Sequence, residues 1–346
     1  MNFWQSLPTP FYVLAPMADV TDAPFRRLIA KYSAHTRADG TVGGPDVMWT
    51  EFVAADGLVR ATPEGKQKLM ADLIYSEEER PIVAQLFSSN EEHMEYAARL
   101  CLELGFDGVD INMGCPDRAI ERQGCGSAMI RNPEAAQRII EAAMRGAKSN
   151  SADGIPVSVK TRIGYNRDEL ETWLPKLLAV HPAAIAVHAR TRKDMSKVPA
   201  RWERVAAAVE IRDAIQGRDI GHTRILGNGD ALSLTDARAK IAATAADGVM
   251  LGRAIFGNPW LFHPEKTVET IPLPERLSVL VEHTKLFSEL LPFKNFSIMK
   301  KHYKAYVKDF PGASELRATL MEQETAAGVA EVVAAYLVSI YATPTV

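Results

Sequence analysis

The sequence predicts an α/β protein: a TIM (β/α)8 barrel followed by a smaller C-terminal all-helical domain. Three observations support this fold class. Short apolar runs alternate with longer amphipathic segments, as in βα units. Eight such alternations fit within about 260 residues, close to the ~250 residues of a typical barrel. After Asn258-Pro259 the β-rich runs stop, and the remaining pattern is helical.

Each predicted strand is almost uninterrupted in apolar residues, which is typical of a parallel strand buried on both faces. We expect strands at residues 11–17, 46–52, 81–87, 107–113, 156–161, 183–189, 223–228 and 247–252. Amphipathic helices lie between them, for example at 91–104, 133–147 and 202–215. An open doubly wound sheet is the alternative, but the first strand is not followed by a GxGxxG motif.

The residues that end these runs indicate where the functional site lies. They recur about every 34 residues, one βα unit of a barrel, and most are polar. The carboxyl ends of barrel strands meet at the face that carries the active site. We therefore expect one cluster at that face, made of Met17, Glu51, Gln85, Asn112, Lys160, His188, Asn228 and Gly252.

We predict two domains, residues 1–265 and residues 271–346, with the proline-marked stretch 271–277 as the linker. Composition is that of an ordinary globular protein, with 47% hydrophobic and 24% charged residues. The longest apolar stretch, 332–342, is too short to span a bilayer. Three cysteines without a CxxC pair fit a reducing compartment. We expect a cytoplasmic protein with no membrane, metal or obligate protein partner.

Cys115 is the first candidate for chemistry. It follows the fourth predicted strand in Asn112-Met113-Gly114-Cys115-Pro116, where glycine allows a sharp turn and proline fixes φ. A thiol displayed there can act as a nucleophile or a proton donor, although a structural cysteine is equally compatible with the position. Cys101 fits a helix core instead, and Cys125 lies in a glycine-rich turn.

Lys160 and His188 end the fifth and sixth strands. A lysine there can form a Schiff base, contact a phosphate or donate to an electron-rich ring. A surface lysine and a core histidine are the structural alternatives. Glycine turns follow the last two strands, where barrels often bind phosphate, and Arg253 adds a cation. These turns, Asn228-Gly229-Asp230 and Gly252-Arg253, favour a phosphorylated cofactor.

Two local basic patches stand out in a chain whose net charge is only −3. Residues 291–308 contain Lys300, Lys304 and Lys308 at helical spacing and no acid. Six basic residues lie between 190 and 204, after the sixth strand. Basic runs of this kind commonly lie on the solvated surface of a protein. Two basic patches near one active site, however, favour a polyanionic substrate.

Together these residues resemble those of the tRNA-dihydrouridine synthases. The resemblance spans nearly the whole chain, in the order Ala15-Pro16-Met17, Thr50-Glu51-Phe52, Gln85, Asn112-x-Gly114-Cys115-Pro116, Val159-Lys160, His188-Ala189-Arg190-Thr191, Asn228-Gly229-Asp230 and Leu251-Gly252-Arg253-Ala254. The C-terminal Lys301-His302, Pro311-Gly312-Ala313 and Leu316-Arg317 are similar to the signature of the helical domain of the family.

The resemblance implies an FMN-binding barrel and a helical tRNA-binding domain. NADPH would reduce the flavin, hydride would pass to C6 of a uracil, and Cys115 would give the proton to C5. It also implies cofactor contacts by Pro16, Met17, Ala18, Gln85, Lys160, His188, Asn228, Gly229, Asp230, Gly252 and Arg253. Glu51 and Asn112 would face the uracil, and we expect the two basic patches to add substrate contacts by Arg190, Lys300 and Lys304. A flipped-out base must reach the barrel mouth.

Three other functions stay open at this point. A flavin-dependent reductase of a free pyrimidine or another small molecule would use the same barrel without the basic patches. A lyase would form a Schiff base on Lys160 and need no flavin. A tRNA-binding protein without catalysis would be indifferent to the loss of Cys115.

Overall fold

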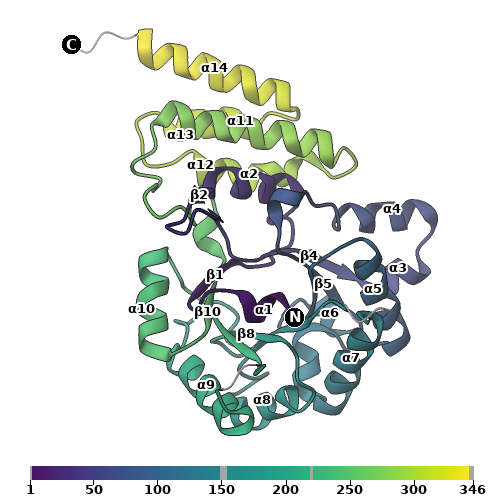
Figure 1. Ribbon diagram of the computed structural model, residues 1–346. Coiled ribbons are helices and arrows are strands. Elements are labelled where there is room, and N and C mark those ends of the chain that lie inside the picture. Colours follow the sequence, from purple (N-terminus) through teal and green to yellow (C-terminus); the bar gives the residue numbers. More distant parts are fainter. Residues whose placement is uncertain (1, 149–153, 219–220, 343–346) are drawn as a thin grey trace. The chain divides into compact units, whose positions relative to one another are not determined.

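The computed structural model describes residues 2–148, 154–218 and 221–342. Within these residues, eight parallel strands form one sheet in the order β1-β10-β9-β8-β7-β6-β5-β4 (Figure 1). The two ends of the sheet meet through a parallel bridge between Val13 and Val47. There the N–H of Leu14 donates to the carbonyl of Val47 over 3.1 Å. The sheet thereby closes on itself, and the predicted TIM (β/α)8 barrel is confirmed.

Every predicted strand is present, with limits within three residues of those expected. The first ends at Leu14, two residues before Pro16, which cannot donate a ladder hydrogen bond. The second runs on to Ala54 through a register shift between Trp49 and Phe52. The strands are β1 (Phe11–Leu14), β4 (Met48–Ala54), β5 (Ile82–Phe87), β6 (Gly108–Met113), β7 (Val157–Arg162), β8 (Ala184–His188), β9 (Arg224–Asn228) and β10 (Gly248–Leu251).

Helices surround the barrel (Figure 1). In α7, Ala136, Ile139, Ile140 and Ala143 are buried, which is the i, i+3, i+4, i+7 spacing of one helix face. The helices and 3₁₀ turns are α1 (Phe3–Ser6), α3 (Ala55–Arg60), α4 (Pro63–Ala71), η1 (Glu77–Glu79), α5 (Glu91–Glu103), α6 (Arg118–Glu121), η2 (Gly126–Arg131), α7 (Pro133–Gly146), α8 (Leu170–Leu178), α9 (Glu203–Gln216), α10 (Leu234–Thr244) and η3 (Arg253–Ile255).

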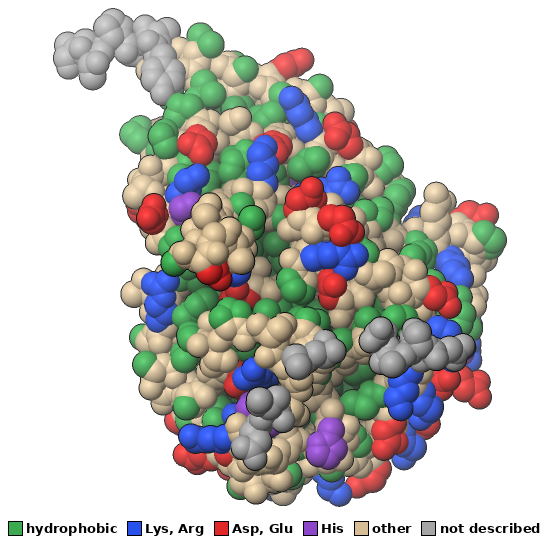
Figure 2. Space-filling view, in the orientation of Figure 1, with side chains coloured by type: hydrophobic (Ala, Val, Ile, Leu, Met, Phe, Trp, Pro, Cys, Tyr) green, Lys and Arg blue, Asp and Glu red, His purple; other side chains and the backbone are tan. Residues whose placement is uncertain are grey.

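The short helix α1 closes the end of the barrel at which the strands begin. Its Trp4 is fully buried, with ring centroids 5.7 Å from Trp49 and 5.9 Å from Phe11. Figure 1 looks onto this end, with α1 at the centre of the barrel, and Figure 2 has the same orientation. Charges of both signs are mixed over the surrounding helices in Figure 2. The carboxyl ends of the strands therefore lie on the opposite side of the barrel.

The contacts divide the chain into two compact units, Met1–Ala18 with Pro45–Arg253 and Asp19–Gly44 with Ala254–Val346. The second unit thus contains a segment that comes between two barrel strands in the sequence. The predicted domain limits, 1–265 and 271–346, stay a prediction. The elements of this unit are α2 (Ala23–Ser33), β2 (His35–Thr36), β3 (Val42–Gly43), α11 (Leu273–Leu290), η4 (Phe296–Met299), α12 (Lys300–Tyr306), α13 (Ala313–Met321) and α14 (Ala326–Ala342).

The helix α2 packs against α11 inside the second unit. The ring of Phe25 stacks on His283 at 4.9 Å, and Tyr32 donates to the Glu282 carboxylate over 2.6 Å. Most of the stretch predicted as a linker is helical, because α11 already begins at Leu273. Pro274 is tolerated there because the first turn of a helix needs no N–H from it. In the described part of the chain, no helix is long and apolar enough to cross a bilayer.

Candidate active site at the barrel mouth

The carboxyl ends of neighbouring strands bring most of the predicted site residues to one end of the barrel. In the sheet register Asn112 of β6 lies beside Lys160 of β7, and His188 of β8 lies beside Asn228 of β9. Gln85 lies within the apolar run of β5 and is fully buried, and Glu51 of β4 is 5% exposed. The barrel thus gathers residues from six strands that are far apart in sequence.

A chain of amides fixes the backbone at Cys115. Asn112 donates from Nδ2 to Oε1 of Gln85 over 3.1 Å, and Gln85 donates from Nε2 to Oδ2 of Asp110 over 2.7 Å. On its other side, Oδ1 of Asn112 accepts the N–H of Gly114 at 3.2 Å and that of Cys115 at 2.9 Å. Because its amide is held from both sides, Asn112 sets the turn that carries the thiol.

Burial governs the protonation of the groups beneath this turn. The side chain of Asp110 accepts from Ser158 and Gln85, yet burial raises its pKa to about 6. Cys115 is half-buried, and burial raises the pKa of its thiol. The thiol therefore stays protonated at neutral pH. Burial also raises the pKa of Cys101 to about 12 and that of Cys125 to about 11.

The carbonyl of Cys115 is held as firmly as its N–H. It accepts the N–H of Ser127 at 2.9 Å and approaches the Ser127 hydroxyl at 2.8 Å. That hydroxyl also lies 2.8 Å from Oε1 of Glu121, which accepts from Arg192 Nε at 2.8 Å. Burial alone would raise the pKa of Glu121, but hydrogen bonds from Arg192 and Ser127 outweigh it and lower the pKa. An ionised carboxylate thus links the Cys115 turn to the loop after β8.

Sequence reasoning missed Arg162, which makes a second link between the same two loops. Its buried guanidinium donates to the carbonyls of Gly114, Thr191 and Met195 over 2.7, 3.1 and 3.0 Å. Burial lowers its pKa to about 10, so it remains charged at neutral pH. The available signal was its position two residues after Lys160, on the same face of the strand.

Lys160 and His188 both have a pKa that burial lowers. Burial and the nearby Arg162 lower the pKa of Lys160 to about 8. No hydrogen bond joins its ammonium to another side chain within the described residues. Burial and the charges of Lys160 and Arg162 also lower the pKa of His188, so its ring is neutral. The ring nitrogen Nε2 of His188 lies 3.2 Å from Nη1 of Arg190.

The ends of β9 and β10 form a cation-rich corner around Asp230. Its carboxylate accepts from Arg190 and from Arg253, each at 2.5 Å, and from the N–H of Ala200 at 2.9 Å. Gly229 has φ of 117°, and a Cβ there would lie 2.9 Å from the Ala200 side chain. Arg190 is buried, whereas 63% of the Arg253 side chain is exposed. Arg190, Arg253 and Asp230 together carry a net charge of +1.

The remaining predicted residues are more scattered. Pro16 and Met17, after β1, are half-buried, and Ala18 is exposed. A Cβ built on Gly252 would lie 3.6 Å from the sulfur of Met17, so the ends of β1 and β10 are neighbours. Lys300 and Lys304 belong to α12 in the second unit, where Lys304 is exposed and Lys300 half-buried. Within the described residues, no group of three His, Cys, Asp or Glu side chains could hold a metal ion.

Comparison with known proteins decides the family. The sequence profile described as "Dihydrouridine synthase (Dus)" matches residues 13–340, nearly the whole chain. The chain belongs to the dihydrouridine synthase family. The predicted family, and with it the prediction of an enzyme, is confirmed.

Named relatives of this family cover almost the full length. A "Probable tRNA-dihydrouridine synthase" of Staphylococcus aureus (strain MRSA252) is 37% identical over 94% of this chain and 93% of its own. A "Probable tRNA-dihydrouridine synthase 2" of Bacillus subtilis (strain 168) is 36% identical over 94% and 93%.

Solved structures support the barrel fold. Histamine dehydrogenase from Rhizobium sp. 4-9 matches with a TM-score of 0.50 and 14% identity, over 80% of this chain and 49% of its own. The chain therefore spans about half the length of that protein. At this identity the likeness concerns the fold alone.

Proposed function

We propose that this protein reduces specific uridines in tRNA to 5,6-dihydrouridine, with FMN as cofactor and NADPH as reductant. The observation that carries the proposal is the position of Cys115, whose N–H and carbonyl are both hydrogen-bonded at the mouth of the barrel and whose thiol has a pKa raised by burial. Membership of the dihydrouridine synthase family and the names of the relatives support the reaction and the RNA substrate.

The residues at the mouth fit an FMN. Its phosphate would suit the corner made by Asn228, Gly229, Asp230, Gly252 and Arg253, because Arg190 and Arg253 both pair with Asp230 there and leave a net positive charge. The Lys160 ammonium, which lacks a hydrogen-bond partner among the described side chains, would donate to the electron-rich ring. Gln85 and His188 would contact the ring system and ribityl chain, with Pro16, Met17 and Ala18 along the ring. When bound, FMN would supply the hydride that adds to C6 of the uracil.

Cys115 would complete the reduction by giving its proton to C5 of the uracil. A donor must be protonated at the working pH, and burial supplies this by raising the pKa of the thiol. Asn112 and Glu51 would face the base, and Arg190 would also contact the substrate. The hydrogen bonds around Asn112, Ser127 and Glu121 would keep the thiol at one place while the base moves in.

A tRNA base can reach this mouth only after it leaves its stack, at a cost of a few kcal/mol. Contacts from Lys300 and Lys304 to phosphates would offset that cost and make affinity fall with salt. Since tRNA is a cytoplasmic molecule in bacteria, the proposal also implies a cytoplasmic protein.

The test begins with the visible spectrum of the purified protein, followed by anaerobic NADPH and unmodified tRNA transcripts. We expect flavin bands that bleach on reduction and are restored as dihydrouridine forms in the tRNA. A colourless protein that takes up no added FMN would refute the cofactor. Reduction of free uridine at the rate seen with tRNA would favour the small-molecule reductase.

A further inference from the structure

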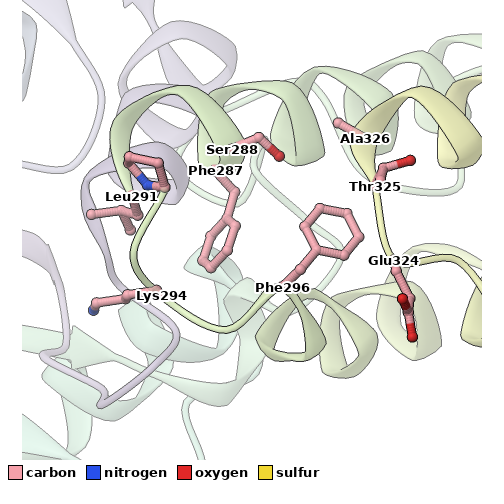
Figure 3. Close-up of a pocket in the computed structure, with 9 residues that line it drawn as sticks. Phe287, Ser288, Leu291, Lys294, Phe296, Glu324, Thr325 and Ala326 are labelled. Atoms are coloured by element: carbon pink, nitrogen blue, oxygen red, sulfur yellow. The ribbon is translucent and has the colours of Figure 1, made fainter.

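The second unit contains a pocket outside the barrel mouth. Its volume is about 410 Å3, and it opens between the end of α11, the turn that leads to η4 and the start of α14 (Figure 3). The side chains of Phe287 and Phe296 project into it, with ring centroids 6.3 Å apart and ring planes at 72°. This size is within the ~300–1,000 Å3 typical of small-ligand sites.

The walls of the pocket suit a flat aromatic group. Phe287 is fully buried and forms the base, whereas Phe296 is half-buried and leaves part of its ring accessible. Leu291 and Pro292 add apolar surface on the α11 side. A partly accessible aromatic ring at the edge of an apolar hollow is a surface on which unstacked nucleobases commonly pack.

The charge of the surrounding chain favours a nucleic acid as the source of that base. Lys294 lines the pocket, and η4 leads directly into α12 with Lys300 and Lys304. From residue 291 to residue 308 the sequence contains five lysines and no acidic residue. A phosphate backbone lying along such a segment would be attracted to it.

Glu324 adds one carboxylate to this basic setting. It is exposed at the rim of the pocket, just before Thr325, whose hydroxyl accepts the N–H of Gly328 in the first turn of α14. A carboxylate only accepts hydrogen bonds. Among the bases, guanine presents two adjacent N–H donors on its Watson–Crick edge, and uracil presents one between two carbonyls.

We propose that this pocket binds an unpaired guanine base of the tRNA, stacked on Phe296 and hydrogen-bonded to Glu324. The inference rests on the proposed function, because tRNA is the substrate there. A base held in the helical unit would act as an anchor, separate from the uridine that is reduced at the barrel mouth.

Two Glu→Gln substitutions distinguish hydrogen bonding by Glu324 from the effect of its negative charge on tRNA affinity. Glu324→Gln and Glu322→Gln each remove one exposed negative charge from the segment between α13 and α14. Loss of a negative charge alone should tighten RNA binding slightly. We expect Glu324→Gln to weaken binding of an unmodified tRNA transcript about five- to twentyfold by filter binding, and Glu322→Gln to leave it equal or tighter. Equal affinities for the two variants would overturn the proposal.

Two phenylalanines test the stacking. Phe296→Ala should weaken tRNA binding about tenfold, and Phe293→Ala, which removes a 42% exposed ring outside the pocket, should not. Phe296→Leu keeps the apolar volume of the side chain but removes the flat ring, so it is a control for misfolding of Phe296→Ala. It should weaken tRNA binding to a similar degree. Matching affinities for Phe296→Leu and Phe293→Ala would refute the anchor.

Dihydrouridine formation measured on the same samples separates the two hypotheses. If wild-type protein makes no dihydrouridine, the proposed function fails. If it does, and kcat/KM is the same in the Glu324 and Phe296 variants, only the pocket proposal fails.

Discussion

The basic loop after β8 and the basic helix α12 look alike in sequence but differ in the structure. In the loop, Arg190 pairs with Asp230, Arg192 with Glu121, and Arg201 and Arg204 with Asp168, so its arginines are tied to carboxylates. In α12, Lys300 and Lys304 form no ion pair with any described side chain, and Lys304 is exposed.

This difference separates two uses of positive charge. Arginines that share a carboxylate hold one loop against another, because planar guanidinium groups make several directed hydrogen bonds at once. Lysines that face water keep their charge available to a phosphate. The loop therefore is expected to control turnover, and the helix to control affinity for RNA. Substitutions in the two regions test this division.

The largest effect is expected at the thiol that the loop surrounds. Cys115→Ala should lower dihydrouridine formation by about 10²–10⁴-fold, because no proton donor remains at C5. The yellow colour and the tRNA affinity should be unchanged. Turnover at the wild-type rate would rule out Cys115 as the proton donor.

The next effect tests the link between the loop and Cys115. Glu121→Gln should lower kcat about tenfold or more with little change in KM, since Arg192 loses its charged partner and the Ser127 contact loosens. Glu91→Gln, which removes a surface pair with Arg138 at 2.8 Å, is the matched control and should have no effect. Equal kcat in both variants would mean that Glu121 does not position the thiol.

Removal of two positive charges from each region tests whether α12 contributes more to tRNA affinity than the loop after β8. Lys300→Gln with Lys304→Gln should weaken tRNA binding about tenfold and flatten its salt dependence. Arg201→Gln with Arg204→Gln removes as much charge, but should change affinity less, because those arginines are already paired. The reverse order of the two Kd values would contradict the division between the regions.

The smallest effect at neutral pH concerns two histidines within the helical unit. His283 and His302 lie with ring centroids 4.5 Å apart, and their ring nitrogens have no partner among the described residues. Burial lowers the pKa of His302 to about 3 and that of His283 well below its usual value. Between pH 3 and 6.5 the unfolded chain therefore binds protons that the folded chain does not.

The contribution of these two histidines to stability should accordingly fall as the pH drops below 6.5, by about 1.4 kcal/mol per pH unit for each, and should be level above pH 7.5. Urea unfolding at pH 7.5 and at pH 5.5 measures this difference. His302→Phe should reduce the slope for the wild type by roughly half. An unchanged slope in that variant would show that other groups cause the acid sensitivity.

Much of the barrel and its mouth follows from local patterns in the sequence. Buried strands need continuous apolar runs, and a polar residue at the end of such a run has to lie at the mouth, whatever the details of packing. The turn at Asn112–Pro116 is likewise encoded by neighbouring residues. For these reasons the eight strands, the fold and the position of Cys115 could be predicted.

Which charges meet and which segments pack together depends on the folding of the whole chain. Arg192 and Glu121 are 71 residues apart, and Lys31 and Glu282 are 251 apart, so no local pattern joins them. The same holds for Arg162, whose partners lie on two other loops, and for α2, which packs on α11 although the two helices are far apart in sequence. Composition counts charges, but only the folded chain sets their distances, and electrostatic energy depends on distance and burial.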